Sequence, residues 1–219
     1  MFEKQISELK DLSIVNTQNI KRLRERTKIL IIDDQPFGYL ESLRKNSFNI
    51  FQREDIESIS DCADYEIVIC DIRGIGKKLE SEYEGAYLAS QIKKSYPDHY
   101  VMIYSANDYN ADYQKFFDTV DDYVSKGEDT SFWSELFDNA IEQRLNPVKL
   151  WEKTSIRLIK AGISTKTLLK IESAYVKSIL KKDESNFRKI ISDKSLSNYS
   201  TELNSLLTLI SIIVTIIAL

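Results

Sequence analysis

Acidic residues follow two apolar runs of the chain, each long enough to form a buried strand. The run over residues 28–32 ends in the acid pair Asp33-Asp34, and the run over residues 66–70 ends in Asp71. Parallel strands bring their carboxyl ends to one edge of a sheet, which is where open α/β sheets build their binding crevice. The sequence therefore predicts that three carboxylates meet at one edge of a sheet.

A hydroxyl and an amine follow two further predicted strands in the same way. The run over residues 100–104 ends at Ser105, and the run over residues 122–125 ends at Lys126. Carboxylates suit Mg2+, which prefers hard oxygen ligands, and phosphoryl transfer needs positioning and positive charge more than covalent help. The five groups are what a magnesium-assisted transfer of a phosphoryl group onto Asp71 requires.

Each of these residues also has an ordinary structural explanation. A pair such as Asp33-Asp34 after a strand commonly caps the following helix, because both side chains accept bonds from free N–H groups. A single lysine after a strand is usually a solvated charge, and a single serine a turn residue. The occurrence of all five residues at four strand ends favours the functional interpretation.

Apolar runs alternate with helical patterns over the first two thirds of the chain, which is typical of a doubly wound parallel sheet. We expect strands near residues 28–33, 48–52, 66–71, 100–105 and 122–125, and helices near residues 37–45, 84–95, 110–118 and 131–145. The predicted fold class is α/β, with a five-stranded, flavodoxin-like sheet followed by an all-helical C-terminal region. The expected segments are an N-terminal helical arm (1–27), the sheet domain (28–146), a basic helical region (147–204) and an apolar C-terminal helix (205–219).

Residues 28 to about 145 resemble the receiver domain of response regulators from bacterial two-component systems, on the strength of these strand ends. The resemblance implies that Asp71 accepts a phosphoryl group from a histidine kinase or a phosphotransfer protein. It also implies that Mg2+ is held by Asp33, Asp34, Asp71 and the backbone carbonyl of Arg73.

Three further roles follow from the same resemblance. Ser105 is expected to bond a phosphoryl oxygen, and Lys126 to pair with the phosphoaspartate. Tyr123 falls at the position of the family's rotating switch aromatic. Added negative charge at Asp71 would draw in the Ser105 loop and leave space for the Tyr123 ring.

Two departures from the receiver pattern bear on the site. Lys126 is followed by Gly127, where the family usually has a proline preceded by a cis bond, so a trans bond is expected here. In addition, the long segment 72–84 separates Asp71 from Gly85 and would overhang the phosphorylation site, narrowing the choice of kinase or slowing hydrolysis.

Composition is consistent with a cytoplasmic protein. The 219 residues include two cysteines, too few for a disulfide framework, and the residues after Met1 are charged rather than apolar, unlike a secretory signal. One histidine, His99, excludes a histidine-rich metal site. Charge is uneven: residues 148–204 hold twelve Lys or Arg and six acids, whereas the first 147 residues hold 18 Lys or Arg and 28 acids.

The C-terminal third leaves the output of the protein open. Residues 157–173 resemble the turn and second helix of a helix-turn-helix, with Gly162 in the turn, Ser164 as N-cap and Thr165, Lys166 and Lys170 toward a major groove. The same residues also fit a plain antiparallel helix pair.

Residues 205–219 carry no charge and suggest an apolar helix, for which two interpretations stand. The preferred one is an anchor that attaches the cytoplasmic protein to membrane lipid at the inner face. The alternative is a buried helix within a helical bundle or homo-oligomer.

The sequence thus predicts a response regulator in a phosphorelay with a helical, membrane-anchored output. The alternatives are a DNA-binding transcription regulator and a receiver-like scaffold that is not phosphorylated. We do not expect an enzyme, beyond self-catalysed phosphoryl transfer and dephosphorylation.

Overall fold

The computed structural model describes residues 8–14, 20–79, 82–106 and 113–217. The chain forms two compact units. The first, here called the sheet unit, comprises residues 20–144. The second, here called the helical unit, comprises residues 1–19 and 145–219.

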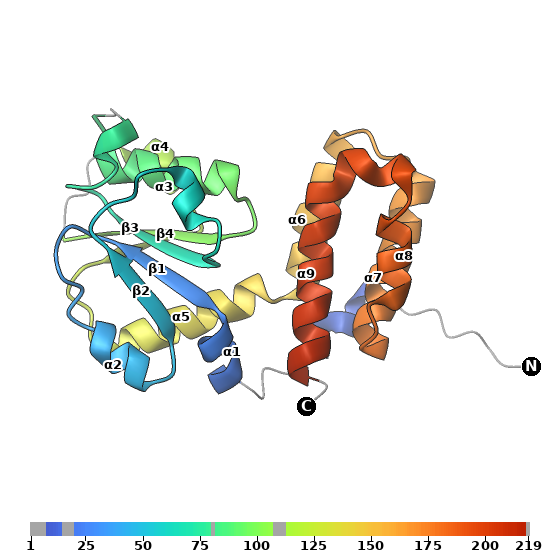
Figure 1. The fold of residues 1–219 in the computed structure, drawn as a ribbon, viewed down its shortest axis with the longest axis horizontal. Coiled ribbons are helices and arrows are strands. Elements are labelled where there is room, and N and C mark those ends of the chain that lie inside the picture. Colours follow the sequence, from blue (N-terminus) through green and yellow to red (C-terminus); the bar gives the residue numbers. More distant parts are fainter. Residues whose placement is uncertain (1–7, 15–19, 80–81, 107–112, 218–219) are drawn as a thin grey trace, which may run out of the picture. The chain divides into compact units, whose positions relative to one another are not determined.

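The sheet unit is built on five parallel strands in the order β2-β1-β3-β4-β5 (Figure 1). This is the flavodoxin-like doubly wound order, as the sequence predicts. Residues 29–32 and 67–70 are fully buried, because helices cover both faces of the sheet. Each strand begins and ends within one residue of its expected position: β1 Lys28–Ile32, β2 Asn49–Arg53, β3 Ile67–Asp71, β4 Tyr100–Ser105 and β5 Asp122–Ser125.

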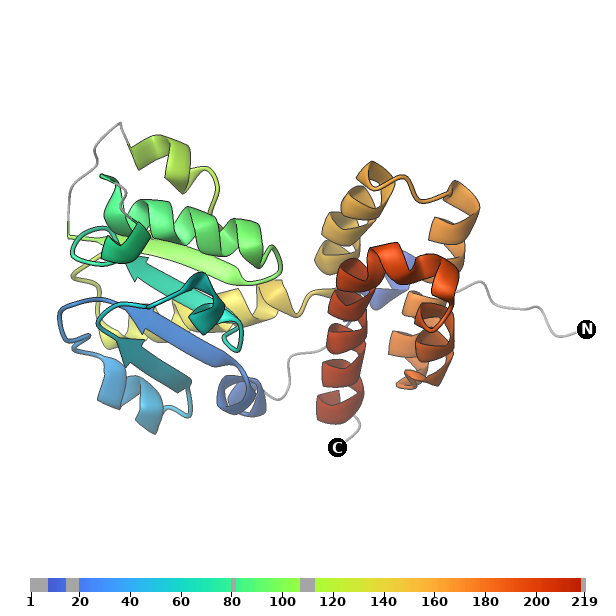
Figure 2. The same cartoon turned by 45° about the horizontal axis from the view of Figure 1, so that its top comes forward.

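Helices lie on both faces of this sheet (Figures 1 and 2). One face carries α3 (Glu84–Ser95) and α4 (Gln114–Phe117), and the other carries α1 (Ile20–Arg26), α2 (Leu40–Lys45) and α5 (Thr130–Arg144). The helix α2 begins later than expected: Phe37 lies in the preceding turn, where its carbonyl accepts from the Leu40 N–H at 3.1 Å and its N–H donates to Gln52 Oε1 at 3.0 Å. Part of the helix expected over 110–118 lies outside the described residues.

The expected N-terminal arm contributes to both units. Its last helix, α1, belongs to the sheet unit. Arg24 of this helix donates from Nε and Nη2 to the two carboxylate oxygens of Asp138, at 2.8 and 2.6 Å. Its guanidinium also lies 4.4 Å from the centre of the Phe48 ring. The short 3-10 helix Leu9–Ile14 instead places Leu12 in the core of the helical unit. Residues 1–7 and 15–19 of the expected arm lie outside the described residues.

The helical unit consists of α6 (Pro147–Lys160), α7 (Thr165–Lys181), α8 (Ser185–Ile191) and α9 (Ser200–Ile217), packed with the 3-10 helix at Leu9–Ile14. Asn146 caps α6 by accepting from the Lys149 N–H at 3.0 Å, and Pro147 occupies the first helical position. The Trp151 and Tyr175 rings stack in its core, 5.7 Å apart.

The apolar C-terminal segment is a packed helix, which corrects the preferred interpretation of residues 205–219. Leu203, Leu206, Ile210 and Ile213 of α9 recur every three or four residues and are buried against α6, α7 and α8. Thr208 and Thr215 are exposed, and their hydroxyls donate to backbone carbonyls one turn earlier. The predicted membrane anchor is therefore not supported, and none of the described helices has the length and apolarity needed to cross a bilayer.

His99 gives the sheet unit a specific dependence on pH. Burial lowers the His99 pKa to about 4, where the ring stacks on Tyr96 and contacts the Cys62 carbonyl oxygen at 3.1 Å. In the unfolded chain His99 binds a proton near pH 6.5, whereas in the folded chain it does so only near pH 4. The free energy of unfolding should therefore fall as pH drops from 6.5 toward 4, by about 3 kcal/mol in total.

The measurement that checks this prediction is urea unfolding between pH 7 and pH 5, above the range where most carboxylates titrate. Wild type should lose stability over this interval, whereas His99→Gln, which leaves no histidine in the chain, should show a nearly flat profile. Equal slopes for the two proteins would contradict the assignment. The comparison uses slopes, so a uniform loss of stability in the variant does not affect it.

Candidate functional site

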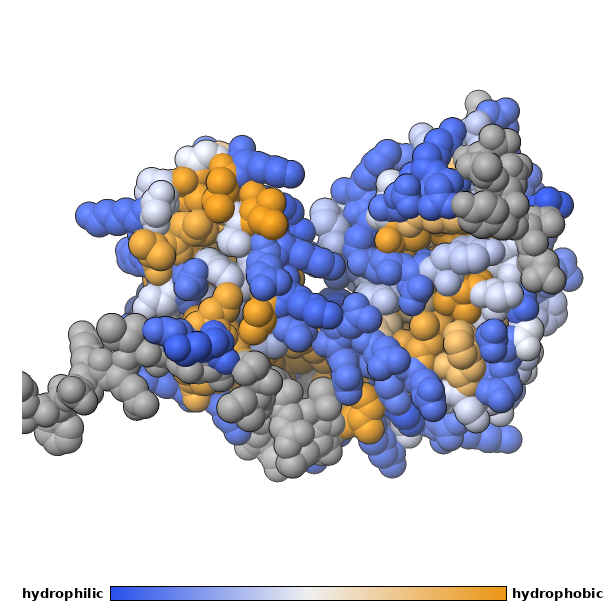
Figure 3. Space-filling model, turned by 180° about the vertical axis from the view of Figure 1, so that it is seen from behind, coloured by the Kyte–Doolittle hydropathy of each residue, from blue (hydrophilic) through white to orange (hydrophobic). Residues whose placement is uncertain are grey.

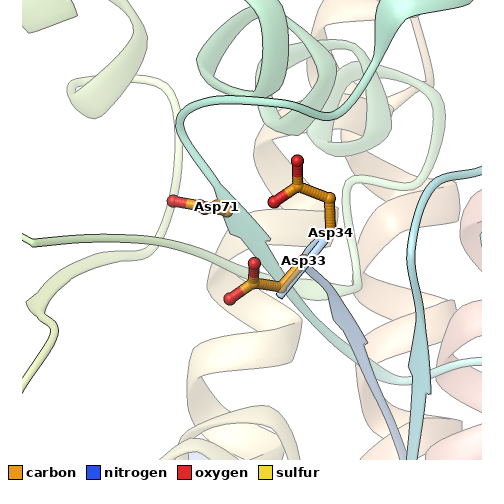
Figure 4. Close-up of side chains that lie close together, drawn as sticks. All are labelled: Asp33, Asp34 and Asp71. Carbon is orange, nitrogen blue, oxygen red and sulfur yellow. The ribbon is translucent and has the colours of Figure 1, made fainter. Parts of the chain in front are cut away.

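The three predicted acids meet at the carboxyl edge of the sheet. Asp33 and Asp34 follow β1, and Asp71 is the last residue of the neighbouring strand β3 (Figure 4). One carboxylate oxygen from each of the three lies within 4.8 Å of the others. Asp33 and Asp71 are buried and Asp34 is exposed, so the cluster opens to solvent on the side of Asp34.

Lys126 joins the two buried acids. Its Nζ lies 2.7 Å from Asp71 Oδ2 and 3.1 Å from Asp33 Oδ2. Burial raises the pKa of Asp71, and the bond from Lys126 offsets only part of that rise. Burial lowers the pKa of Lys126, but its bonds to Asp71 and Asp33 outweigh this and raise it. The ammonium is thus held in its charged form beside Asp71.

Backbone amides fix the remaining oxygens of the buried acids. The Ile72 N–H donates to Asp71 Oδ1 at 2.7 Å, and the Gln35 N–H donates to Asp33 Oδ1 at 2.9 Å. Both carboxylates therefore have defined orientations that do not depend on a bound ligand. Such fixed donors stabilise negative charge without reorganisation.

Tyr104 belongs to this site, although the sequence analysis counts it only as part of an apolar strand. Its hydroxyl donates to Asp33 Oδ2, and Lys126 Nζ lies 4.5 Å from the centre of its ring. Burial, together with Asp33, raises the pKa of Tyr104 far above its usual range, so the phenol stays protonated. A tyrosine within a buried strand is the sequence feature that could have pointed to this role, because a buried tyrosine hydroxyl normally needs a polar partner.

Ser105 and Tyr123 lie on the two strands that complete this edge. Ser105 ends β4 and is buried, and its carbonyl oxygen accepts from the Lys126 N–H at 2.7 Å. Tyr123 is in β5, partly buried, with its ring 4.6 Å from that of Phe117. The structure thus places Ser105 at the end of β4, the strand beside β3, and Tyr123 on β5, one strand further along the sheet. Their roles toward a phosphoryl group stay predictions.

The loop after Lys126 follows a path that proline could not take. The described part of the chain contains no cis peptide bond, which confirms the expected trans bond before Gly127. Gly127 has φ of +113°, whereas proline is fixed near −65°. The glycine therefore suits the altered loop.

Two further acids, which no sequence pattern singles out, hold the part of the long segment that directly follows Asp71; residues 80–81 of that segment lie outside the described residues. The Gly74 N–H donates to Glu84 Oε2 at 2.6 Å, and the Gly76 N–H donates to Asp55 Oδ1 at 2.8 Å. Gly74 has φ of +78°, and a Cβ there would fall 2.1 Å from Asp34 Oδ2. The segment therefore lies directly against the acid cluster.

The donor set fits Mg2+. The groups that converge on the cluster are carboxylate oxygens, and the backbone of the segment at Gly74 approaches Asp34 at a distance that excludes even a methyl group. Hard cations such as Mg2+ select oxygen ligands and keep several waters, which the open side at Asp34 allows. Asp33, Asp34 and Asp71 are the side chains that would hold it.

The strand order and the position of these acids define a doubly wound α/β domain with its site at the carboxyl edge of the sheet. No family model matches the chain, and no curated protein matches it.

Solved structures similar to the chain include response regulators and receiver domains. They include a two-component response regulator from Clostridium difficile (19% identity, TM-score 0.45, covering 55% of this chain and 99% of that one). A response regulator from Thermotoga maritima is also 19% identical (TM-score 0.43, 53% and 98%). The signal receiver domain of an HD domain-containing protein from Pseudomonas fluorescens Pf-5 is 17% identical (TM-score 0.44, 54% and 97%).

Proposed function

We propose that the protein is a response regulator that accepts a phosphoryl group on Asp71 from a histidine kinase or phosphotransfer protein, with Mg2+. The observation that carries this proposal is the position of Lys126 Nζ, bonded to both Asp71 and Asp33 at the carboxyl edge of the sheet. A lysine ammonium held between two buried acids can form an ion pair with the phosphoryl group once that group is attached to Asp71. A purely structural acid pair would not need the third, exposed carboxylate of Asp34 beside it.

The chain's own groups account for most of the transfer. A carboxylate oxygen of Asp71 forms a bond to phosphorus while the bond from phosphorus to the donor breaks, and the donor leaves with the electron pair. The Ile72 N–H orients the carboxylate, and Lys126 pairs with the added negative charge. Mg2+, when bound, would neutralise charge on the phosphoryl oxygens. On this proposal the protein is a phosphoacceptor, with no catalysis beyond transfer and loss of its own phosphoryl group.

The test is phosphorylation of the full chain by acetyl phosphate in the presence of Mg2+, followed by intact mass. Wild type should gain one phosphoryl group, and Asp71→Asn should gain none, because the amide is a very poor nucleophile. Asp64→Asn, at an exposed position outside the site, should behave as wild type. Absence of incorporation into wild type would favour the unphosphorylated scaffold, and equal incorporation into Asp71→Asn would contradict the assigned residue.

The helical unit is the natural candidate for output, and its surface is mixed. The predicted turn and cap are present: Gly162 has φ of +86°, and Ser164 accepts from the Thr167 N–H at 3.2 Å. Lys166 and Lys170 are exposed, as helix-turn-helix recognition would need, but Leu169 is 59% exposed between them. Apolar surface is visible on this unit (Figure 3). This mixture favours neither duplex DNA nor a protein partner.

A further inference from the structure

The segment that follows Asp71 is held by a carboxylate from the start of the next helix. Glu84, the first residue of α3, accepts from the Gly74 N–H at 2.6 Å. On its other side the same glycine is so near Asp34 that a Cβ would lie 2.1 Å from Oδ2. Gly74 therefore contacts both Glu84 and the acid cluster.

Peptide planarity gives this hydrogen bond a consequence for the preceding residue. The Gly74 N–H and the Arg73 carbonyl belong to one planar trans unit, in which the two groups point in opposite directions. Fixing the N–H toward Glu84 therefore fixes the Arg73 carbonyl in the opposite direction. The Arg73 carbonyl is the backbone group expected to ligate Mg2+.

Glu84 itself is held in an unusual conformation. Its φ is +39°, in the left-handed region that side chains other than glycine rarely adopt. The next residue, Gly85, donates to the Ile72 carbonyl at 3.0 Å, which ties the helix start to the residue after Asp71. The Glu84 carboxylate thus comes from a fixed point, as a positioning group requires.

A second acid supports the same segment from another strand. Asp55, just beyond β2, accepts from the Gly76 N–H at 2.8 Å and from its own neighbour, Ile56, at 2.8 Å. The segment is thus attached at two alternate amides to two different elements of the sheet unit. Residues 74 and 76 are therefore both tied down, and the attachment at Gly74 is the one adjacent to the cluster.

We infer that Glu84 is a positioning residue for the metal site: by binding the Gly74 N–H, it orients the Arg73 carbonyl as a ligand and favours Mg2+ over Ca2+. The inference rests on the proposed function, since it needs the acid cluster to bind Mg2+. Mg2+ demands near-octahedral geometry, whereas Ca2+ accepts variable geometry and ligand number. A carbonyl held in one direction therefore matters more for Mg2+ than for Ca2+.

The test is calorimetric titration of the full chain with Mg2+ and, separately, with Ca2+. Glu84→Ala should weaken Mg2+ binding by about 10-fold or more, as loss of a second-layer partner usually does, with a clearly smaller effect on Ca2+. Glu84→Gln keeps an acceptor oxygen and should retain most of the Mg2+ affinity. Glu82→Ala removes the same charge from an exposed position two residues away and should change either affinity little.

Each other outcome has a distinct meaning. Equal loss of Mg2+ and Ca2+ binding in Glu84→Ala, matched by Glu84→Gln, would overturn the inference, because charge alone would then explain the effect. Unchanged Mg2+ binding in Glu84→Ala would also overturn it. No Mg2+ binding by wild type would instead refute the proposed function. Glu84→Gln keeps the comparison usable if Glu84→Ala is poorly folded.

Discussion

Gly85→Ala is expected to lower the free energy of unfolding of the sheet unit by about 3 kcal/mol or more, the upper range for overpacking a core. A Cβ at position 85 would lie 1.9 Å from the Asp71 carbonyl oxygen and 2.8 Å from the Ile75 side chain. The Asp71 backbone is held in β3 between two neighbouring strands, so it has little freedom to move away. Helix α3 would therefore have to separate from the strand end.

The measurement is urea unfolding of the full chain, compared with Gly38→Ala. Gly38 is exposed, and its φ lies outside the left-handed region that favours glycine. A Cβ there would meet nothing within 4 Å. That control should change stability by no more than about 0.5 kcal/mol. A Gly85→Ala protein as stable as the control would show that α3 is not seated on β3 as described.

Lys126→Met is expected to have the largest effect on the site itself. The change removes the cation bonded to Asp71 and Asp33 but keeps a side chain of similar length. Two adjacent buried carboxylates lose their cationic partner, which should lower the free energy of unfolding at neutral pH by about 2 kcal/mol, the scale of a charged hydrogen bond at a partly exposed lysine. Phosphorylation by acetyl phosphate should fall strongly for the same reason.

The sign of the pH dependence distinguishes this explanation from a general packing defect. Burial already raises the pKa of Asp71, and loss of Lys126 raises it further. A carboxyl whose pKa is raised on folding stabilises the folded state at low pH and loses that contribution as pH rises. The difference between Lys126→Met and wild type should therefore be greatest near pH 7 and shrink as pH falls toward 4.

Two comparisons check the interpretation of the lysine variant. Added Mg2+ should raise the melting temperature of Lys126→Met more than that of wild type, because the metal replaces the lost positive charge. Lys94→Met, at an exposed position on α3, should match wild type at every pH. A defect in Lys126→Met that is constant with pH and unaffected by Mg2+ would point to lost packing instead.

The sheet and the three acids could be predicted because they rest on short-range patterns. Residues 29–32 and 67–70 are apolar without interruption, as strands covered on both faces must be, and the acids directly follow these runs. Once the strands are parallel, their order along the chain brings Asp33, Asp34 and Asp71 together.

The remaining contacts at the site are between residues far apart in sequence, and they leave no periodic signal. Tyr104 reaches Asp33 from a strand 71 residues later, and Asp55 binds an amide 21 residues away. Glu84, the first residue of α3, follows a polar segment whose acids look equivalent to it in sequence. These contacts depend on the three-dimensional path of the chain, which propensity and spacing do not specify.

The C-terminal helix was misjudged for a different reason. The hydropathy of α9 shows that its apolar side chains must be shielded from water, but it does not distinguish shielding by lipid from shielding by other helices. Helices α6, α7 and α8 cover α9, and the core that they share also includes Leu12, which lies near the opposite end of the chain. Thr208 and Thr215 mark the uncovered face, and their side chains satisfy their own hydroxyls by bonding to the helix backbone.

The position of Leu12 in the helical unit also sets an order of events during synthesis. The helical unit is discontinuous in sequence, because residues 20–144 separate its first segment from the rest. The sheet unit is continuous and can fold as soon as it leaves the ribosome, whereas Leu12 has no core to enter until α6, α7 and α9 have been made. The sheet unit would thus be complete before the helical unit can close.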